Sequence, residues 1–249
     1  MNDKPRKTAL LLAQRIVRDI DQQGLGPGEK LPAERLMMDS YDAGRGTLRE
    51  SLRFLELQGV LSLKPGPGGG PVVRKPDAGH LATTLALMLQ FEHAEYRVIA
   101  EARAAFEPVV AQLAAERITA PGQAELGRTL AEMAAALNDA EAFLDADRRF
   151  HRTVAWASQN SLFGFLVDVL AGGMESSLPD ADQPVRQRQL ILRAHQRIHN
   201  AIAAGSPAEA GAAMRTHIED VLAYAARRSP DALARPITWE SHVSLEDLP

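Results

Sequence analysis

The sequence predicts a mainly α-helical protein in two parts. In the first part, apolar residues recur at helical spacing up to about residue 58, and two short strand-like runs then flank a stretch rich in glycine and proline. In the second part, from about residue 79 to 228, the chain is rich in alanine and leucine and nearly all helical in pattern. We therefore expect three helices and a β-hairpin, followed by a helical domain.

The elements of the first part are predicted from the spacing of apolar residues and from the glycines and prolines that end each element. Helices are expected over residues 8–23, 32–39 and 44–58. The third helix has an apolar stripe at Leu48, Leu52 and Leu55, with arginines on the adjacent solvent-facing stripe, and Gly59 ends it. Strands are expected at Val60–Leu63 and Val72–Arg74, on either side of the sequence KPGPGGGP. Three helices and a two-stranded wing make a winged helix-turn-helix.

The second part is expected to begin after a short linker. We place the first domain at residues 1–75, the linker at 76–79, the helical domain at 80–228 and a tail at 229–249. Helices are expected near residues 79–91, 94–118, 121–137, 139–158, 161–176, 184–204 and 206–228. The tail has no clear period, so it is either a strap anchored by Trp239 or disordered.

Composition narrows the class of protein. A content of 45% hydrophobic and 24% charged residues is typical of a globular protein, and no run of about 18 apolar residues predicts a membrane helix. The beginning of the chain lacks the features of a signal peptide, so we expect a cytoplasmic location. Because the chain has no cysteine, any metal site must use histidine and carboxylate ligands.

Charge is distributed unevenly along the chain. Residues 1–75 carry 13 Lys and Arg against 9 Asp and Glu, a net charge of +4, whereas residues 76–249 carry 15 against 23, a net charge of −8. A basic first part is consistent with a domain that faces nucleic acid. The acidic remainder argues against an architectural protein that coats DNA without sequence preference.

The first part also contains motifs that resemble a known family. They are Leu31-Pro32-x-Glu34-Arg35, Arg45-x-Thr47-Leu48-Arg49-Glu50 and Leu55-Glu56-x-x-Gly59. In register over about 40 residues, they resemble the winged helix of the GntR family of bacterial regulators. The resemblance implies that the protein binds double-stranded DNA, at an operator with an inverted repeat.

The third helix would then lie in the major groove with its first residues at base edges. Arg45 and Arg49, one turn apart near that end, can each offer a bidentate fork to guanine. Thr47 can donate its hydroxyl group, and the resemblance places Arg35 for phosphate or base contact. At Gly46, within the contact segment, many family members carry threonine, so this chain departs from the pattern there. We expect Glu50 and Glu56 to pair with nearby arginines instead of contacting DNA.

The second part contains a candidate metal site. Asp147 and His151 lie at i and i+4 on one helical face, where they can hold one ion. His195 and His217 lie on two consecutive helices that antiparallel packing can bring together. Three imidazoles and a carboxylate suit a divalent ion, zinc in the first place, with nickel or manganese as alternatives. His199, one turn beyond His195, is the competing ligand.

This arrangement, together with Arg103-x-x-Phe106-Glu107-Pro108, resembles the FCD effector domain of the FadR subfamily of GntR regulators. The resemblance covers about residues 80–228. It implies an all-α antiparallel bundle of six or seven helices, a central metal held by the Asp and three His, a carboxylate-bearing effector and a homodimer.

For the effector, a small carboxylate or hydroxy acid, Arg103 is the best anchor because a guanidinium group matches a carboxylate bidentately. The alternative for Arg103 is an internal ion pair with Glu107. Arg148, Arg149 and Asn160, which flank the metal helix, are weaker candidates. We thus expect a metabolite-responsive transcriptional repressor, with a regulator that senses the metal ion itself as the alternative. An enzyme is not expected, because no His-Glu-x-x-His or Gly-x-Ser-x-Gly motif is present.

Overall fold

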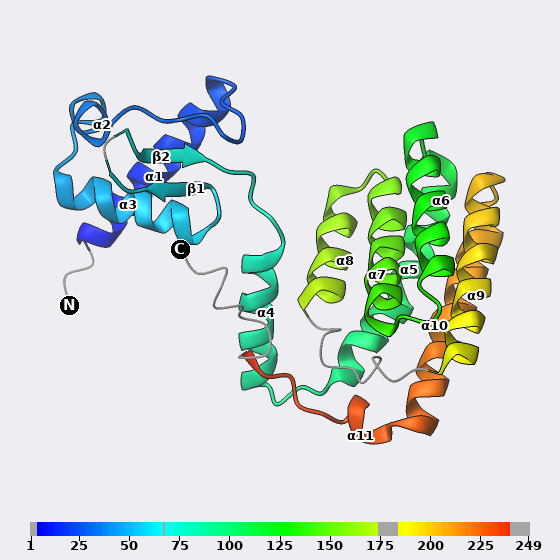
Figure 1. The fold of residues 1–249 in the computed structure, drawn as a ribbon. Coiled ribbons are helices and arrows are strands. Elements are labelled where there is room, and N and C mark those ends of the chain that lie inside the picture. The colour runs from blue at the N-terminus through cyan, green and yellow to red at the C-terminus, as the bar shows by residue number, and fades with distance from the viewer. Residues whose placement is uncertain (1–3, 67, 174–183, 240–249) are drawn as a thin grey trace. The chain divides into compact units, whose positions relative to one another are not determined.

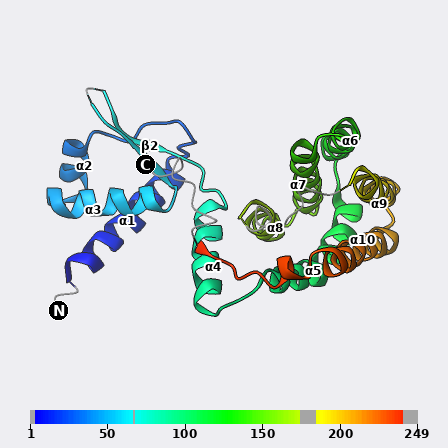
Figure 2. The same ribbon diagram turned by 60° about the horizontal axis from the view of Figure 1, so that its bottom comes forward.

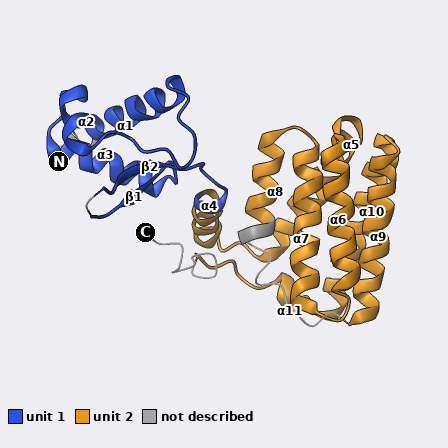
Figure 3. Cartoon of the chain, turned by 45° about the horizontal axis from the view of Figure 1, so that its top comes forward, with its two compact units in different colours: residues 1–80, 248–249 blue, residues 81–247 orange. Residues whose placement is uncertain are grey.

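The computed structural model describes residues 4–66, 68–173 and 184–239. The chain forms two compact units, one ending at His80 and the other beginning at Leu81 (Figure 3). The first holds three helices and a hairpin, and the second is helical (Figure 1). None of the helices in the described residues is long and apolar enough to cross a membrane.

The first unit is a winged helix-turn-helix. Its elements are α1 (Lys4–Gln22), α2 (Glu34–Tyr41), α3 (Arg45–Leu57), β1 (Leu61–Lys64) and β2 (Gly70–Val73). The two strands pair antiparallel, with Leu61 opposite Val73 and Lys64 opposite Gly70. The apolar faces of the helices meet in one core, which contains Leu12, Ile16, Met37, Leu48, Leu52, Leu55 and Leu61. The predicted stripe of α3 therefore faces inward and leaves its arginines outside.

Residues 28–31, between α1 and α2, form a strand-like segment that pairs with β2 of the wing. The Gly28 N–H donates to the Val73 carbonyl (2.8 Å), the Val73 N–H donates to the Glu29 carbonyl (2.8 Å), and the Leu31 N–H donates to the Pro71 carbonyl (2.9 Å). Lys30 also donates its ammonium group to the Gly68 carbonyl (2.9 Å) at the tip. These bonds are made mostly by the backbone, so the side-chain pattern does not reveal them.

The second unit contains the predicted run of seven long helices. They are α4 (Gly79–Phe91), α5 (Tyr96–Arg117), α6 (Ala120–Ala135), α7 (Ala140–Ala157), α8 (Ser161–Gly173), α9 (Val185–Ala203) and α10 (Pro207–Arg228). Helices α5 to α10 contribute side chains to the main core, and Figures 1 and 2 show these helices packed into a bundle from two directions. The expected end of the fifth of these helices, at residue 176, lies outside the described residues.

The chain continues after α10 as a strap, which we define as residues 229–239. The strap begins with a short helix, α11 (Pro230–Leu233), that was not expected. The Ile237 N–H then donates to the Ala94 carbonyl (2.9 Å), and the Trp239 N–H donates to the Gln90 Oε1 atom on α4 (2.6 Å). Ile237 is 1% exposed and Trp239 is 40% exposed, so Ile237 is the buried anchor of the strap and Trp239 joins α4 through its backbone. Residues 240–249 lie outside the described residues.

Candidate functional site

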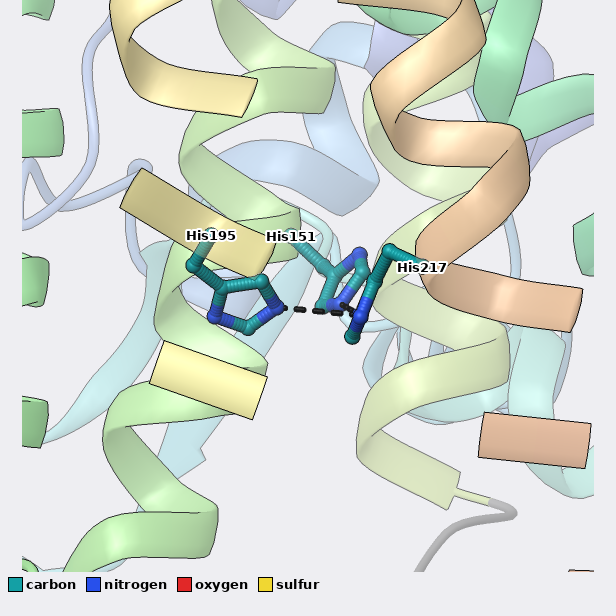
Figure 4. A group of neighbouring side chains, drawn as sticks. All are labelled: His151, His195 and His217. Carbon is teal, nitrogen blue, oxygen red and sulfur yellow. Dashed lines mark hydrogen bonds between the residues drawn. The ribbon is translucent and has the colours of Figure 1, made fainter. Parts of the chain in front are cut away.

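Three buried histidines meet in the middle of the helical unit. His151 on α7, His195 on α9 and His217 on α10 are each at most 4% exposed. The His217 Nε2 atom lies 3.0 Å from the His195 Nε2 atom and 3.2 Å from the His151 Nε2 atom. Figure 4 shows the three rings directed toward one another from three different helices. Asp147, one turn before His151 on α7, places its Oδ1 atom 3.4 Å from the His195 Nε2 atom.

The contacts on the outer side of the rings determine which nitrogen faces inward as an acceptor. The His151 Nδ1 atom lies 2.6 Å from the Glu107 Oε2 atom, so its Nδ1–H donates to that carboxylate and its Nε2 lone pair points to the centre. The His195 Nδ1 atom faces the Met133 sulfur at 3.1 Å, and its ring stacks on Phe150 with a centroid distance of 4.2 Å. Both rings are thus held in orientations that direct Nε2 inward.

The histidine group, meaning His151, His195 and His217, fits a divalent ion. Two nitrogen ligands at about 2.0–2.1 Å from a shared ion lie about 3.0–3.4 Å apart, which matches the two separations above. Burial, and secondarily the neighbouring histidines, hold the pKa of His195 and the pKa of His217 well below the usual value of a histidine. The neutral imidazole is the form that binds metal, so His195 and His217 are in their ligating state at neutral pH.

Glu107 connects this group to an arginine. The Arg103 Nε–H donates to the Glu107 Oε1 atom (2.5 Å), while the Oε2 atom accepts from His151. Burial by itself would raise the pKa of Glu107, but the Arg103 guanidinium and then His151 outweigh it and hold that pKa below its usual value. The ion pair between Arg103 and Glu107 is thus formed. The contact from Glu107 to His151, 44 residues away, was not foreseen from the sequence.

A cavity of about 340 Å³ opens beside the histidine group. Asp147, His151 and His217 line one end of it together with Arg103, and Ala232 and Leu233 of α11 line another part. Its apolar walls include Phe143, Ile191, Ile218, Val221 and Leu222. A mostly apolar cavity of this size with a few polar groups is typical of a site for a small molecule.

The three weaker effector candidates, Arg148, Arg149 and Asn160, do not line this cavity. Arg149 is exposed, and its Nη2 atom pairs with the Glu132 Oε2 atom (2.8 Å). Because Arg149 is two residues before His151, it lies on the opposite side of α7. The Asn160 Oδ1 atom accepts the Leu162 N–H (3.1 Å) at the start of α8, so its side chain supports that helix end. Their assignment to the effector site is therefore not supported by the fold.

The structure separates His199 from the histidine group. His199 lies one turn after His195 on α9, where it is half-buried, and its Nδ1 atom lies 3.2 Å from the Asn200 Oδ1 atom. Among the described residues, the histidines that could share one ion are His151, His195 and His217.

The predicted DNA-contact residues lie on the outside of the first unit. Arg45, Gly46 and Arg49 are exposed on the first turns of α3, Thr47 is half-buried, and Arg35 is exposed on α2. The Arg49 Nε atom pairs with the Glu34 Oε2 atom at 3.1 Å, a contact that the sequence did not indicate. Further along α3, Arg53 pairs with Glu56 (2.7 Å), as expected. The first turns of α3 therefore present two arginines to solvent.

Comparison with known proteins identifies both units. Residues 8–69 match the family model described as "Bacterial regulatory proteins, gntR family", and residues 98–220 match the model "FCD domain". The HTH-type transcriptional regulator LutR of Bacillus subtilis is 30% identical over 206 residues, which cover 80% of this chain and 93% of LutR. The chain belongs to the GntR family. All of the expected DNA-contact residues lie in the first match, and all four expected metal ligands lie in the second.

Other members support this assignment. The HTH-type transcriptional repressor NanR of Edwardsiella tarda is 28% identical over 224 residues, which cover 88% of this chain and 85% of NanR. The solved structure of Streptococcus agalactiae GntR superposes with a TM-score of 0.73 at 26% identity, covering 87% of this chain and 99% of that one. This GntR-family protein is therefore a transcriptional regulator with an FCD domain, and not an enzyme.

Proposed function

We propose that this GntR-family regulator is a repressor that responds to a small carboxylate or hydroxy acid bound together with a divalent ion. The observation that supports this proposal is the histidine group at the wall of a cavity large enough for a small molecule. Asp147, His151, His195 and His217 would hold the ion, which is zinc, nickel or manganese. When bound, the ion supplies a Lewis-acid site for an oxygen atom of the effector.

The protein's own residues would position the effector. Glu107 fixes the orientation of His151, and Arg103, which is paired with Glu107, lines the same end of the cavity. The apolar wall excludes water from the carbon skeleton of the ligand. The charge of the bound ion would favour an acid over a neutral or cationic metabolite.

For the DNA-binding unit, we propose that a homodimer binds an operator with an inverted repeat. Arg45, Thr47 and Arg49, with the Gly46 backbone between them, would contact base edges, and Arg35 would contact phosphate or base. Effector binding would change the spacing of the two winged helices and so lower operator affinity, with a coupling of roughly 1–3 kcal/mol.

The proposal is tested by measuring metal content and operator binding on the same preparations. Purified protein should contain about one divalent ion per chain, and His151→Ala, His195→Ala and His217→Ala should each lose it. His199→Ala, on the same helix as His195 but outside the histidine group, is the matched control. Full metal content in the His195→Ala protein would contradict the assigned site.

Operator binding is then titrated with metal, with and without hydroxy acids. Release of operator only when both metal and acid are present supports the proposal. Release by the ion alone would instead indicate a metal sensor, in which the cavity has no role in the signal.

A further inference from the structure

A buried arginine of α9 lines the cavity and has no charged partner among the described residues. Arg188 is 7% exposed, and its Nε–H donates to the Leu137 carbonyl (2.8 Å). Across residues 4–66, 68–173 and 184–239, no carboxylate pairs with Arg188, and its two terminal amino groups make no hydrogen bond. A guanidinium group has five N–H donors, so four of them are left for something in the cavity.

This arginine differs from the other cation at the cavity wall that was expected to bind the effector. Arg103 is neutralised by Glu107, which is itself buried. Asp147 is the single carboxylate among the described lining residues, and it lies beside the histidine group. A buried charge without a partner costs several kcal/mol, and an anion bound in the cavity would remove much of that cost.

The distance between Arg188 and the histidine group follows from their positions on α9. Arg188 and His195 are seven residues apart on α9, so they lie on the same helix face about 10 Å apart along its axis. Gln187 and Arg188 of α9 line the cavity at the first level, and Ile191 lines it between the two levels. The cavity therefore has two anion-binding ends, the ion at one and Arg188 at the other.

We infer that Arg188 determines effector specificity by binding a second carboxylate, so that the effector is a hydroxy-dicarboxylic acid or a similar diacid. This inference rests on the proposed function. One end of the acid would lie at the metal centre, and its distal carboxylate would receive a bidentate pair of hydrogen bonds from the Arg188 amino groups. A purely structural role at Leu137 would need only the Nε–H.

Matched pairs of acids test the inference, because each pair differs only in the distal carboxylate. Metal-loaded full-length protein is titrated calorimetrically with malate and α-hydroxybutyrate, α-hydroxyglutarate and α-hydroxyvalerate, and α-hydroxyadipate and α-hydroxycaproate. For at least one of these three pairs, we expect the diacid to bind at least about tenfold more tightly than its monoacid partner. Arg188→Gln should abolish this preference and leave the metal content unchanged.

Two further variants make the result specific. Arg186→Gln removes an exposed arginine from the same helix and should keep the preference for diacids. Arg188→Lys keeps the charge but loses the bidentate geometry, so it should reduce the preference, and it replaces Arg188→Gln if that variant does not fold.

The outcomes distinguish the inference from the proposed function. If monoacids bind as tightly as diacids at every chain length, or if the variants of Arg188 keep the preference, the inference is overturned while a carboxylate effector stands. If metal-loaded protein binds no acid of either kind, the proposed function fails and the inference fails with it.

Discussion

Glu107 is a single side chain that serves both the histidine group and the cavity. One of its oxygens accepts from His151 and the other accepts from Arg103, and all three side chains are largely removed from solvent. An ionised carboxylate at this place fixes the tautomer of His151 and makes its Nε2 atom a better ligand. The same charge keeps the Arg103 guanidinium from being an unpaired buried cation.

We predict that Glu107→Gln lowers metal affinity by about 10–100-fold, because the amide no longer orients and polarises His151. The dissociation constant is measured by competition with a chelating dye at neutral pH. Glu101→Gln, an exposed change on the same helix, is the control and should bind metal as the unmodified protein does. Equal affinities for both variants would show that His151 needs no support from Glu107.

Arg49 on α3 is the residue of the DNA-binding unit whose substitution gives the clearest test. We predict that Arg49→Ala reduces operator affinity by roughly 1–3 kcal/mol, with a smaller loss on random duplex, because a bidentate contact to a base is removed. Folding should be unaffected, since this side chain is 60% exposed. Fluorescence anisotropy on both duplexes provides the measurement.

Arg53→Ala is the matched control for that measurement. Arg53 lies on the same helix but pairs with Glu56 beyond the first turns, so its removal should affect both duplexes alike. Unchanged operator preference in Arg49→Ala would mean that another part of the domain reads the bases.

The helices α7, α9 and α10 each contribute one histidine to the core of the bundle, where large apolar side chains surround the histidine group. Phe150, Ile198 and Met214, all at most 1% exposed, lie on the same three helices. Without an ion, the low pKa of His195 and of His217 keeps these rings uncharged in the folded chain. In the unfolded chain, they titrate near the ordinary value of about 6.5.

The free energy of unfolding of chelator-treated protein should therefore fall as the pH falls below about 6.5, because the unfolded chain then takes up protons that the folded chain does not. Denaturant titrations between about pH 8 and about pH 5 measure this slope. His195→Gln should make this slope shallower, because it removes one of the two histidines whose pKa is lowered. Glu107, whose pKa is also lowered, adds its effect only at lower pH, below about 4.5.

The elements themselves are largely predictable from the sequence. Apolar periodicity predicts a helix at residues 184–204, and α9 covers Val185–Ala203. This succeeds because the spacing of the buried apolar residues of a helix is visible in its own sequence. The Asp147 and His151 spacing likewise predicts neighbours on one helix face. The strand-like segment at residues 28–31 is not predicted, because it is held by backbone hydrogen bonds, which produce no alternation of apolar and polar side chains.

The partners of buried charges are less predictable. Arg188 has the spacing of an ordinary helix residue, and its burial depends on the Leu137 carbonyl, 51 residues away. Glu107 and His151 are 44 residues apart. Such pairs are set by which helices pack together, and a single sequence does not encode that packing locally.

Considered as a whole molecule, the helical unit has a direct route from its cavity to α4. Leu233 and Ala232 of α11 line the cavity, and the strap that follows bonds to Ala94 and Gln90. Helix α4 is the first helix after the linker region, so the strap joins the ligand site to the segment that leads to the DNA-binding unit. Coupling between two sites needs an element with two discrete arrangements, and we propose the strap as that element.

We predict that Ile237→Ala weakens the effect of an acid on operator affinity, because it loosens the buried anchor of the strap. Metal content and operator affinity without the acid should be retained. Trp239→Ala is the control, since Trp239 is bonded through its backbone and its side chain is 40% exposed. Coupling is reciprocal, so operator DNA must reduce acid affinity by the same factor in each variant. Full coupling in Ile237→Ala would assign the route elsewhere.

The place of the strap in the chain also orders events during protein synthesis. Domains form as units, and the one nearer the N-terminus forms first as the chain leaves the ribosome. The winged helix, which ends before residue 80, is therefore complete before His217 and the strap have been made. Under the proposed function, the DNA-reading fold therefore forms before the effector site, which is complete only when Ser229, Ala232 and Leu233 have joined the cavity wall.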